Sequence, residues 1–171
     1  MQERPGAALG PHPQESHASD GGGQLTASEP RVSLTDYRAL AAFRYELRCF
    51  LAFSEQAARA AGIEPQQHQL LLAVRGLPDG LRPNIRTISE RLLVQHHTAV
   101  ALVDKLEQRG LVRRERQLED KREVLIRLTA QGSKLLRELS RQHRARLKNV
   151  GPEMVTALSA ILGTWHAAEI A

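Results

Sequence analysis

The stretch that decides the fold is residues 84–129, NIRTISERLLVQHHTAVALVDKLEQRGLVRRERQLEDKREVLIRLT. Its first part predicts two short helices, because apolar residues recur at helical spacing over 84–92 and again over 97–109. Asn84 is the expected N-cap of the first helix, and Gly110 ends the second. Only Leu93-Val94-Gln95-His96 connects them, and two short helices joined so tightly are typical of a helix-turn-helix.

A charged β-hairpin follows the second helix. Residues 111–116 predict one strand, and residues 122–128 predict another, with Val124, Ile126 and Leu128 on one face. A helix-turn-helix followed by a basic hairpin describes a winged helix-turn-helix. We therefore expect a mainly α fold with a small β-hairpin wing.

Long helices flank this unit. A helix over 36–61, ended by Gly62, carries one apolar stripe and a second, nearly opposite, formed by Tyr45, Cys49 and Phe53. Another helix begins at Pro65 and runs to Arg75. A helix that is apolar on two sides must be covered on both. We expect one stripe to pack on the core of the same subunit, and the other to face a second subunit or a ligand cleft. The main stripe consists of Leu40, Phe43, Leu47, Phe50, Leu51, Ser54, Ala58 and Ala61.

After the hairpin, Thr129 is expected to cap a long basic helix that runs to Asn149. Gly151-Pro152 is expected to break it, so that a last helix covers 153–168. The winged helix-turn-helix region is too small to cover the apolar faces of long helices at both ends of the chain. We therefore expect these helices to pack against a second subunit in a dimer. The expected divisions are a disordered N-terminal arm, 1–32; a dimerisation helix, 33–62; a winged helix-turn-helix DNA-binding region, 63–129; and dimerisation helices, 130–171.

Composition narrows the class of protein. The arm is rich in Pro, Gly, Ser, Gln and His and has almost no large apolar residue, so it cannot bury enough surface to order itself. A single cysteine among 171 residues excludes an intrachain disulfide framework and a cysteine-rich zinc module. No apolar run is long enough for a membrane span, and no secretory signal opens the chain. The expectation is a cytoplasmic protein without a membrane partner.

Positive charge is concentrated in one block. Residues His96 to Asn149 contain 14 Lys and Arg against 7 Asp and Glu, whereas the rest of the chain is slightly acidic. Such a block indicates an anionic partner, of which nucleic acid is the leading candidate. A solvated basic helix face is the alternative.

Residues near the start of helix 97–109 are expected to point away from the core. Small or polar groups there suit the major groove, where glutamine reads adenine and alanine or threonine meets the thymine methyl. Lys105, further along, would reach phosphate. In the hairpin, Asp120 would orient the Arg122 guanidinium for a narrow minor groove. The candidate DNA-binding residues are Gln95, His96, His97, Thr98, Ala101, Lys105, Arg113, Arg114, Arg116, Asp120, Lys121 and Arg122.

These segments resemble the MarR family of bacterial transcriptional regulators. Residues 98–112, TAVALVDKLEQRGLV, resemble its recognition helix, and 120–129, DKREVLIRLT, resemble its wing. Gly132 fits the start of the family's next helix, and 65–72 look like its second helix. The resemblance covers about residues 36–168. It implies a homodimeric winged-helix protein that binds a pseudo-palindromic operator in double-stranded DNA, usually as a repressor, and is released by a small, often aromatic or phenolic effector.

The chain departs from the family pattern in the turn. Leu93 stands where many members have glycine, and we expect its side chain to pack inward. Gln95-His96-His97 replaces a cap that usually contains serine or proline.

Three further hypotheses concern individual side chains. Phe50, Phe53, His68 and Arg75 lie where the family's effector cleft opens, although packing at the dimer seam explains them equally well. Cys49, one turn from Tyr45, would make a thiol redox-sensing regulator, although an unpaired cysteine is usually a small buried hydrophobe. The histidines, with His143 isolated, offer no set of three metal ligands, so neither metal nor cofactor is expected.

The leading interpretation is a DNA-binding repressor. A helical protein-interaction module that keeps the winged-helix fold but does not bind DNA is the alternative, and Lys105 and Arg122 argue against it. No nucleophile–base pair, paired carboxylates or phosphate loop is found, so an enzyme is not expected.

Overall fold

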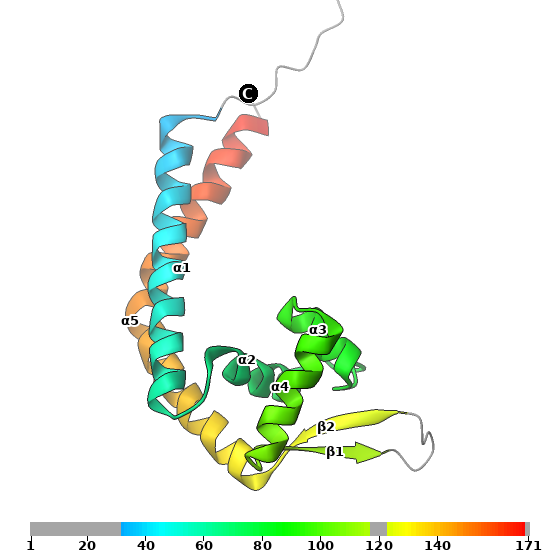
Figure 1. Cartoon of the computed structure of the whole chain (residues 1–171). Coiled ribbons are helices and arrows are strands. Elements are labelled where there is room, and N and C mark those ends of the chain that lie inside the picture. The colour runs from blue at the N-terminus through cyan, green and yellow to red at the C-terminus, as the bar shows by residue number, and fades with distance from the viewer. Residues whose placement is uncertain (1–31, 117–122, 170–171) are drawn as a thin grey trace, which may run out of the picture. The chain divides into compact units, whose positions relative to one another are not determined.

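The computed structural model describes residues 32–116 and 123–169, with side chains through Gly163. The predicted arm, 1–32, lies outside this range except for Val32. The order of elements is α1 (Leu34–Ala60), α2 (Pro65–Arg75), α3 (Ile85–Leu92), α4 (His96–Gln108), β1 (Val112–Arg116), β2 (Val124–Leu128) and α5 (Ala130–Glu169). Figure 1 shows α1 beside α5, with the smaller elements gathered at one end of this pair. The mainly α fold with a β-hairpin wing is confirmed.

Helix α1 begins two residues earlier than its apolar stripe predicts. Ser33 and Asp36 form a capping box, in which the Asp36 amide donates to Ser33 Oγ at 3.2 Å and the Ser33 amide donates to the Asp36 carboxylate at 2.7 Å. This exchange satisfies two amides that the helix start would otherwise leave unpaired. The N-caps predicted for α3 and α5 are confirmed: the Thr87 amide donates to Asn84 Oδ1, and the Gly132 amide donates to Thr129 Oγ1.

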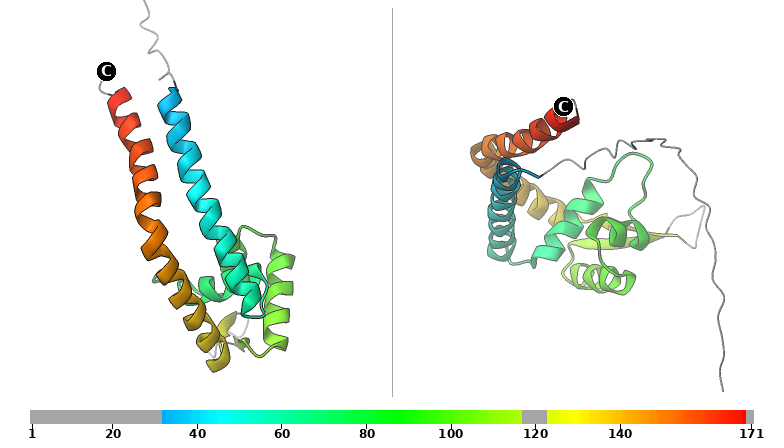
Figure 2. Two further views of the ribbon diagram at one scale, coloured as in Figure 1. Left: turned by 90° about the vertical axis from the view of Figure 1, so that its left-hand side faces the viewer. Right: turned by 90° about the horizontal axis from the view of Figure 1, so that it is seen from above.

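Helix α5 is continuous, so the prediction of a break at Gly151-Pro152 is wrong. A proline inside a helix removes one N–H donor and crowds the preceding turn. Contact with α1 on both sides of Pro152 holds the helix together: Leu139 is buried before it, and Ala157 and Ile161 are buried after it. Figure 2 shows α5 running along α1 in two further views.

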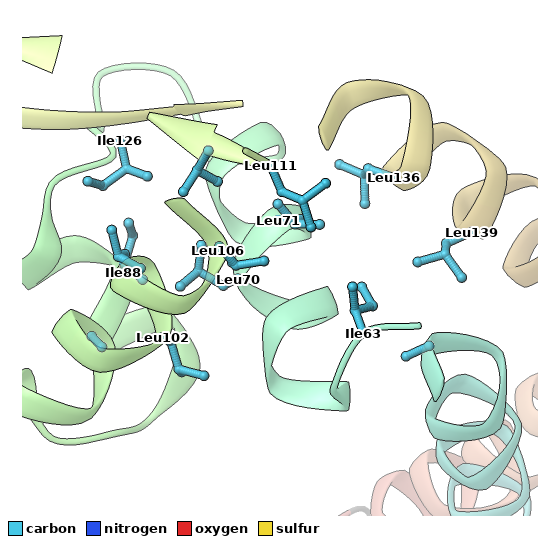
Figure 3. Close-up of a cluster of buried hydrophobic side chains, with 14 of the residues drawn as sticks. Ile63, Leu70, Leu71, Ile88, Leu102, Leu106, Leu111, Ile126, Leu136 and Leu139 are labelled. Carbon is cyan, nitrogen blue, oxygen red and sulfur yellow. The ribbon is translucent and has the colours of Figure 1, made fainter. Parts of the chain in front are cut away.

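The core lies where the winged helix meets the start of α5 (Figure 3). Ala99, Leu102, Val103 and Leu106 line the buried face of α4, as predicted. Leu136 and Leu139 bring α5 into the same cluster. The cluster centres on the largest fully buried side chains, which are Leu70, Leu71, Ile88, Leu106, Ile126, Leu139, Val103 and Val112.

The two strands form an antiparallel hairpin in which Val112 pairs with Leu128 and Arg116 pairs with Val124. Alternation predicts burial of one face of β2, but both Leu125 and Ile126 are buried. Strand β2 contacts α2, α3 and α5, so helices cover more of it than a free hairpin would allow. The Ile126 amide also donates to the Pro83 carbonyl at 2.8 Å, which ties the wing to the loop before α3.

Gly132 is fixed by close packing at the start of α5. A Cβ atom at this position would lie 1.9 Å from the Leu111 carbonyl oxygen. Real Cβ atoms do not approach an oxygen this closely, so only glycine lets α5 dock on the backbone at the start of the wing. No helix in the described part of the chain is both long and apolar enough to cross a membrane.

Candidate nucleic-acid interface

The turn between α3 and α4 is built around Leu93. This residue has φ 54 and ψ 43, the left-handed conformation, and its side chain is 92% exposed. The prediction that Leu93 packs inward is therefore wrong. A left-handed residue directs its side chain away from the turn it closes, and the flanking Leu92 and Val94 make the contacts with the core instead.

Helix α4 presents a polar first turn. Gln95 is the N-cap residue, and its side chain makes no capping hydrogen bond. Gln95, His96, His97, Ala101 and Lys105 are exposed, and Thr98 is half-buried. His97 and Ala101 lie on the side of α4 away from the buried Leu102 and Leu106, and Thr98 lies at the edge of the buried face.

Arg114 joins the wing to α4. Its guanidinium donates from Nη2 to Asp104 Oδ1 at 2.6 Å and from Nη1 to Glu107, whose other oxygen accepts the Arg114 amide at 2.9 Å. Partial burial lowers the pKa of Arg114, but the hydrogen bonds from both carboxylates and their charges outweigh burial, so this pKa lies above its ordinary value. The charge of Arg114 is already balanced inside the protein.

The contacts of Arg114 with Asp104 and Glu107 clamp β1 to α4, and we call them the Arg114 clamp. A second set of hydrogen bonds, the Glu123 clamp, holds the start of β2. The Glu123 carboxylate, just before β2, accepts a hydrogen bond from Arg82 and a 3.1 Å hydrogen bond from Asn84 Nδ2. Asn84 simultaneously caps α3 through its Oδ1. One asparagine therefore fixes both the start of α3 and the base of the wing, and each strand is tied separately to the helix-turn-helix.

The remaining wing candidates divide into three groups. Arg113 donates to Glu115 at 2.9 Å on the exposed surface. Arg116 is exposed at the end of β1. Asp120, Lys121 and Arg122 lie outside the described residues, so their position at the wing tip stays a prediction.

Three of the four effector candidates meet around a residue that the sequence did not single out. His143 of α5 lies with its ring centroid 5.8 Å from Phe50, 5.5 Å from Phe53 and 4.8 Å from His68. The expectation that His143 is isolated is wrong. The signal was present in the spacing, because Leu136, Leu139 and His143 recur along one helix face. Arg75 is not in this cluster and lines a different pocket.

Hydrogen bonds define the tautomer of His143. Its Nδ1 lies 2.7 Å from the Leu139 carbonyl oxygen, and its Nε2 lies 2.8 Å from Ser54 Oγ. A carbonyl only accepts, so Nδ1 carries the hydrogen, and in the neutral ring Nε2 accepts from the Ser54 hydroxyl. Ser54 is buried in α1, so this contact links α1 to α5.

His68 is the most strongly perturbed histidine in the described residues. It is 2% exposed, and its buried Nδ1 has no hydrogen-bond partner there. Burial first, and then the neighbouring His143, lowers the pKa of His68 to about 4. The ring is therefore neutral at physiological pH and behaves as part of the seam between α2, α1 and α5.

Cys49 and Tyr45 are adjacent on α1, and Cys49 is half-buried. A hydrogen bond to Cys49, followed by the charges of Cys49 and Glu46, raises the pKa of Tyr45. Redox sensing by Cys49 stays a prediction. Among the described residues, no three histidine, cysteine or acidic side chains gather into a metal site.

A helix-turn-helix with a hairpin clamped beside its second helix defines a winged-helix protein. The model of the MarR family matches residues 61–123, which run from the C-cap of α1 to the residue before β2. The predicted resemblance is thereby confirmed over these residues: this part of the chain is similar to the MarR family, and a solved MarR family structure shares the fold. No curated protein sequence matches the chain.

Solved structures with this fold come from several bacteria. A mutant of MepR from S. aureus, bound to an oligodeoxyribonucleotide, is 22% identical, with a TM-score of 0.57 over 75% of this chain and 97% of that one. AbsC, a MarR family transcriptional regulator from Streptomyces coelicolor, is 19% identical, with a TM-score of 0.61 over 80% and 95%. CouR from Rhodococcus jostii, bound to p-coumaroyl-CoA, is 24% identical, with a TM-score of 0.56 over 77% and 95%.

Proposed function

We propose that the protein is a homodimeric DNA-binding regulator of transcription, acting as a repressor that a small effector releases. The observation that carries this proposal is the polar, uncapped first turn of α4 beside a wing that two clamps hold in place. A surface that reads DNA needs a fixed distance between its groove-binding helix and its backbone-binding hairpin. The Arg114 and Glu123 clamps supply that distance.

The first turn of α4 would enter the major groove. Gln95, His96 and His97 carry donors and acceptors for base edges, while Thr98 and Ala101 suit a thymine methyl. Since no side chain caps the first amides of α4, they are available to a phosphate, which a helix start attracts. Lys105, exposed further along, would contact the backbone of the duplex.

The wing would supply a second, electrostatic contact. Arg113 and Arg116 are exposed on β1, and Lys121 and Arg122, oriented by Asp120, are the proposed tip contacts. We assign Arg114 a positioning role, because Asp104 and Glu107 already hold its guanidinium.

The second copy would cover the two long helices. Large apolar side chains are exposed along both, and a groove of about 540 Å³ between them is lined by small residues such as Ala39, Ala157 and Ala160. Apolar surface on this scale is usual in obligate interfaces. The exposed residues are Leu34, Tyr37, Leu40, Tyr45 and Leu51 on α1, and Leu147, Val155, Leu158 and Leu162 on α5.

The structural neighbours support both kinds of ligand. The MepR mutant is bound to an oligodeoxyribonucleotide, and CouR is bound to p-coumaroyl-CoA. On this basis we propose double-stranded DNA and a small-molecule effector as partners. No enzymatic activity is proposed.

Selection of bound duplexes from a random DNA library tests the proposal. A dimer should recover an inverted repeat with half-sites about one helical turn apart. The matched control is the His97→Ala variant, which should recover a changed motif rather than none, because base contacts specify and phosphate contacts position. Binding with no motif, or no binding at moderate salt, would contradict the proposal and favour the protein-interaction module.

A further inference from the structure

We propose that the outer face of the first half of α5 is a second, sequence-independent contact for duplex DNA, which holds phosphates outside the segment that α4 reads. The inference rests on the proposed function and deepens it, since it adds a DNA-binding surface that belongs to neither the helix-turn-helix nor the wing. We call this surface the α5 basic stripe, and it consists of Lys134, Arg137, Arg141, Arg144 and Lys148.

The residues of the stripe share one face of α5. They recur at intervals of three and four positions, which on a helix places side chains one above another. All of them are exposed. The buried Leu136 and Leu139 and the half-buried His143 lie on the opposite side, where α5 packs on α1 and the core. The stripe therefore faces away from the core, and at 1.5 Å per residue it is about 21 Å long.

Carboxylates balance little of this charge. Glu138 is the only acidic residue between Lys134 and Lys148, and its carboxylate lies 3.4 Å from the Arg141 guanidinium on the exposed surface. In the part of the chain that the structure describes, no carboxylate lies within ion-pairing distance of the other cations of the stripe. Like charges three or four residues apart on a helix repel one another and destabilise it. An anionic partner that spans the stripe would offset this repulsion.

The composition of the stripe favours a nucleic acid over a protein or a membrane. Between Lys134 and Lys148, a range that the structure describes in full, Leu147 is the one large apolar side chain that is exposed. Protein interfaces have an apolar centre, and helices that lie on a membrane bury an apolar face in it. Interfaces with DNA are instead strongly positive. A duplex carries one phosphate charge per about 1.7 Å of its axis, so the stripe would face about twelve of them.

The same face of α5 changes from basic to apolar after Pro152. Val155 and Leu162 follow Lys148 by seven and fourteen positions, so they continue this face, and both are exposed. They belong to the surface proposed for the second copy, which would leave the basic half uncovered. Because the winged helix packs against the opposite side of α5, the stripe would hold other phosphates than those beside the first turn of α4.

The salt dependence of binding to a random-sequence duplex, measured by fluorescence anisotropy, tests the stripe. Each phosphate contact contributes about 0.9 to the slope of log affinity against log salt concentration. The double variant Arg137→Gln/Arg144→Gln should therefore lower this slope by about 2 and bind at least about tenfold more weakly in 0.1 M salt. The matched control, Arg137→Lys/Arg144→Lys, keeps both charges and should bind as the wild type does. Glu138→Gln removes the carboxylate of the stripe and should bind more tightly.

Hydroxyl-radical footprinting on the selected operator locates the contact. The wild type should protect backbone outside the two half-sites, and the double glutamine variant should lose that protection alone. The motif that this variant selects from a random library should be unchanged, because phosphate contacts carry no sequence information. Circular dichroism and sedimentation velocity of each variant separate loss of the contact from loss of the fold or of the dimer.

Four results would overturn the proposal. They are an unchanged salt slope in the double glutamine variant, an equal loss in the double lysine variant, protection lost evenly over the whole footprint, and binding of polyglutamate or of phosphatidylserine vesicles as tight as that of the duplex. The stripe and the proposed function can fail separately. If the double glutamine variant keeps both the motif and the slope of the wild type, the regulator stands and the stripe fails. If the wild type binds random duplexes with a slope that depends on the stripe but selects no motif, the stripe stands and the proposed function fails.

Discussion

Arg114 of the wing donates to Asp104 of α4 with Nη2 and Oδ1 2.6 Å apart. The same guanidinium contacts Glu107 one turn further along the helix. Two carboxylates on a surface proposed to meet DNA repel the phosphates and so oppose binding. We therefore infer that Asp104 and Glu107 favour binding in another way, by holding the arginine that fixes β1 beside α4.

Replacing Asp104 and Glu107 together by alanine should lower affinity for DNA, by about tenfold, because the wing loses its fixed position. A purely electrostatic role predicts the opposite, since two negative charges are removed from the surface. Glu90→Ala is the matched control. It removes a carboxylate from an exposed pair with Arg86 and should leave affinity unchanged or raised. Fluorescence anisotropy with the selected duplex measures the effect, and a gain in affinity for the double variant would refute the clamp.

Arg122→Ala should weaken DNA binding strongly while the dimer persists, as measured by anisotropy and by analytical ultracentrifugation. The reason is the loss of a cation proposed for the narrow minor groove. The fall in affinity should be similar for operator and random DNA, whereas His97→Ala should reduce discrimination between them. Unchanged affinity of Arg122→Ala would refute the wing assignment.

Stability should fall as the pH drops from about 6.5 to 4 because of His68. Its pKa in the folded protein is about 4, against 6.5 for the free side chain, so the unfolded chain binds more protons between these values. The free energy of unfolding therefore decreases with falling pH, by at most about 3 kcal/mol from this residue. Urea unfolding at a series of pH values, compared with His68→Leu, isolates the contribution. Parallel profiles for the two proteins would contradict it.

Gly132→Ala should destabilise the fold by more than about 2 kcal/mol, because the added Cβ would lie 1.9 Å from the Leu111 carbonyl oxygen. The same change at Gly151, where the added carbon meets nothing within 4 Å, is the control. There alanine should stabilise α5 by about 0.5–1 kcal/mol, its usual advantage over glycine inside a helix. Thermal unfolding distinguishes the two outcomes, and equal effects would show that the close approach at Gly132 is not limiting.

Leu93→Gly should stabilise the protein by about 1 kcal/mol, since a leucine in the left-handed region is strained and this one is 92% exposed. Leu92→Gly, its neighbour inside α3, should destabilise, because it removes a side chain that packs on the core. Chemical denaturation measures both. A loss of stability on replacing Leu93 would mean that its side chain has a contact in the assembled protein.

Local patterns predicted most of the fold. Pro65 and Arg75 bound α2, Asn84 caps α3, and Ala99 and Leu106 mark the buried face of α4, because each depends on neighbours within a few residues. The errors concern contacts between distant segments. Pro152 predicts a helix break from its local sequence, but α1 packs against α5 on both sides of it. His143 is isolated in the sequence because its partner Ser54 lies 89 positions earlier in the chain.

In the candidate interface, too, features set by neighbouring residues could be predicted from the sequence, whereas contacts between distant segments could not. Helical angle alone separated the exposed side of α4 from its core side. Counting positive charges could not show that Arg114 is neutralised within the protein while Arg75 and Arg137 are left facing a pocket. Which charge is available depends on where carboxylates lie in three dimensions.

The unbroken α5 acts as a lever arm. With 40 residues it extends about 60 Å from its start at the wing toward its far end. If the part beyond Pro152 is held by a second copy, the free stretch before it is about 33 Å long, so a tilt of about 10° at Pro152 moves the start of α5 by about 6 Å, which is more than one base-pair step of a duplex. Small angular changes in this helix would thus change the distance between the two recognition helices of a dimer. In a helix broken at the proline, bending at the break would leave that distance unchanged.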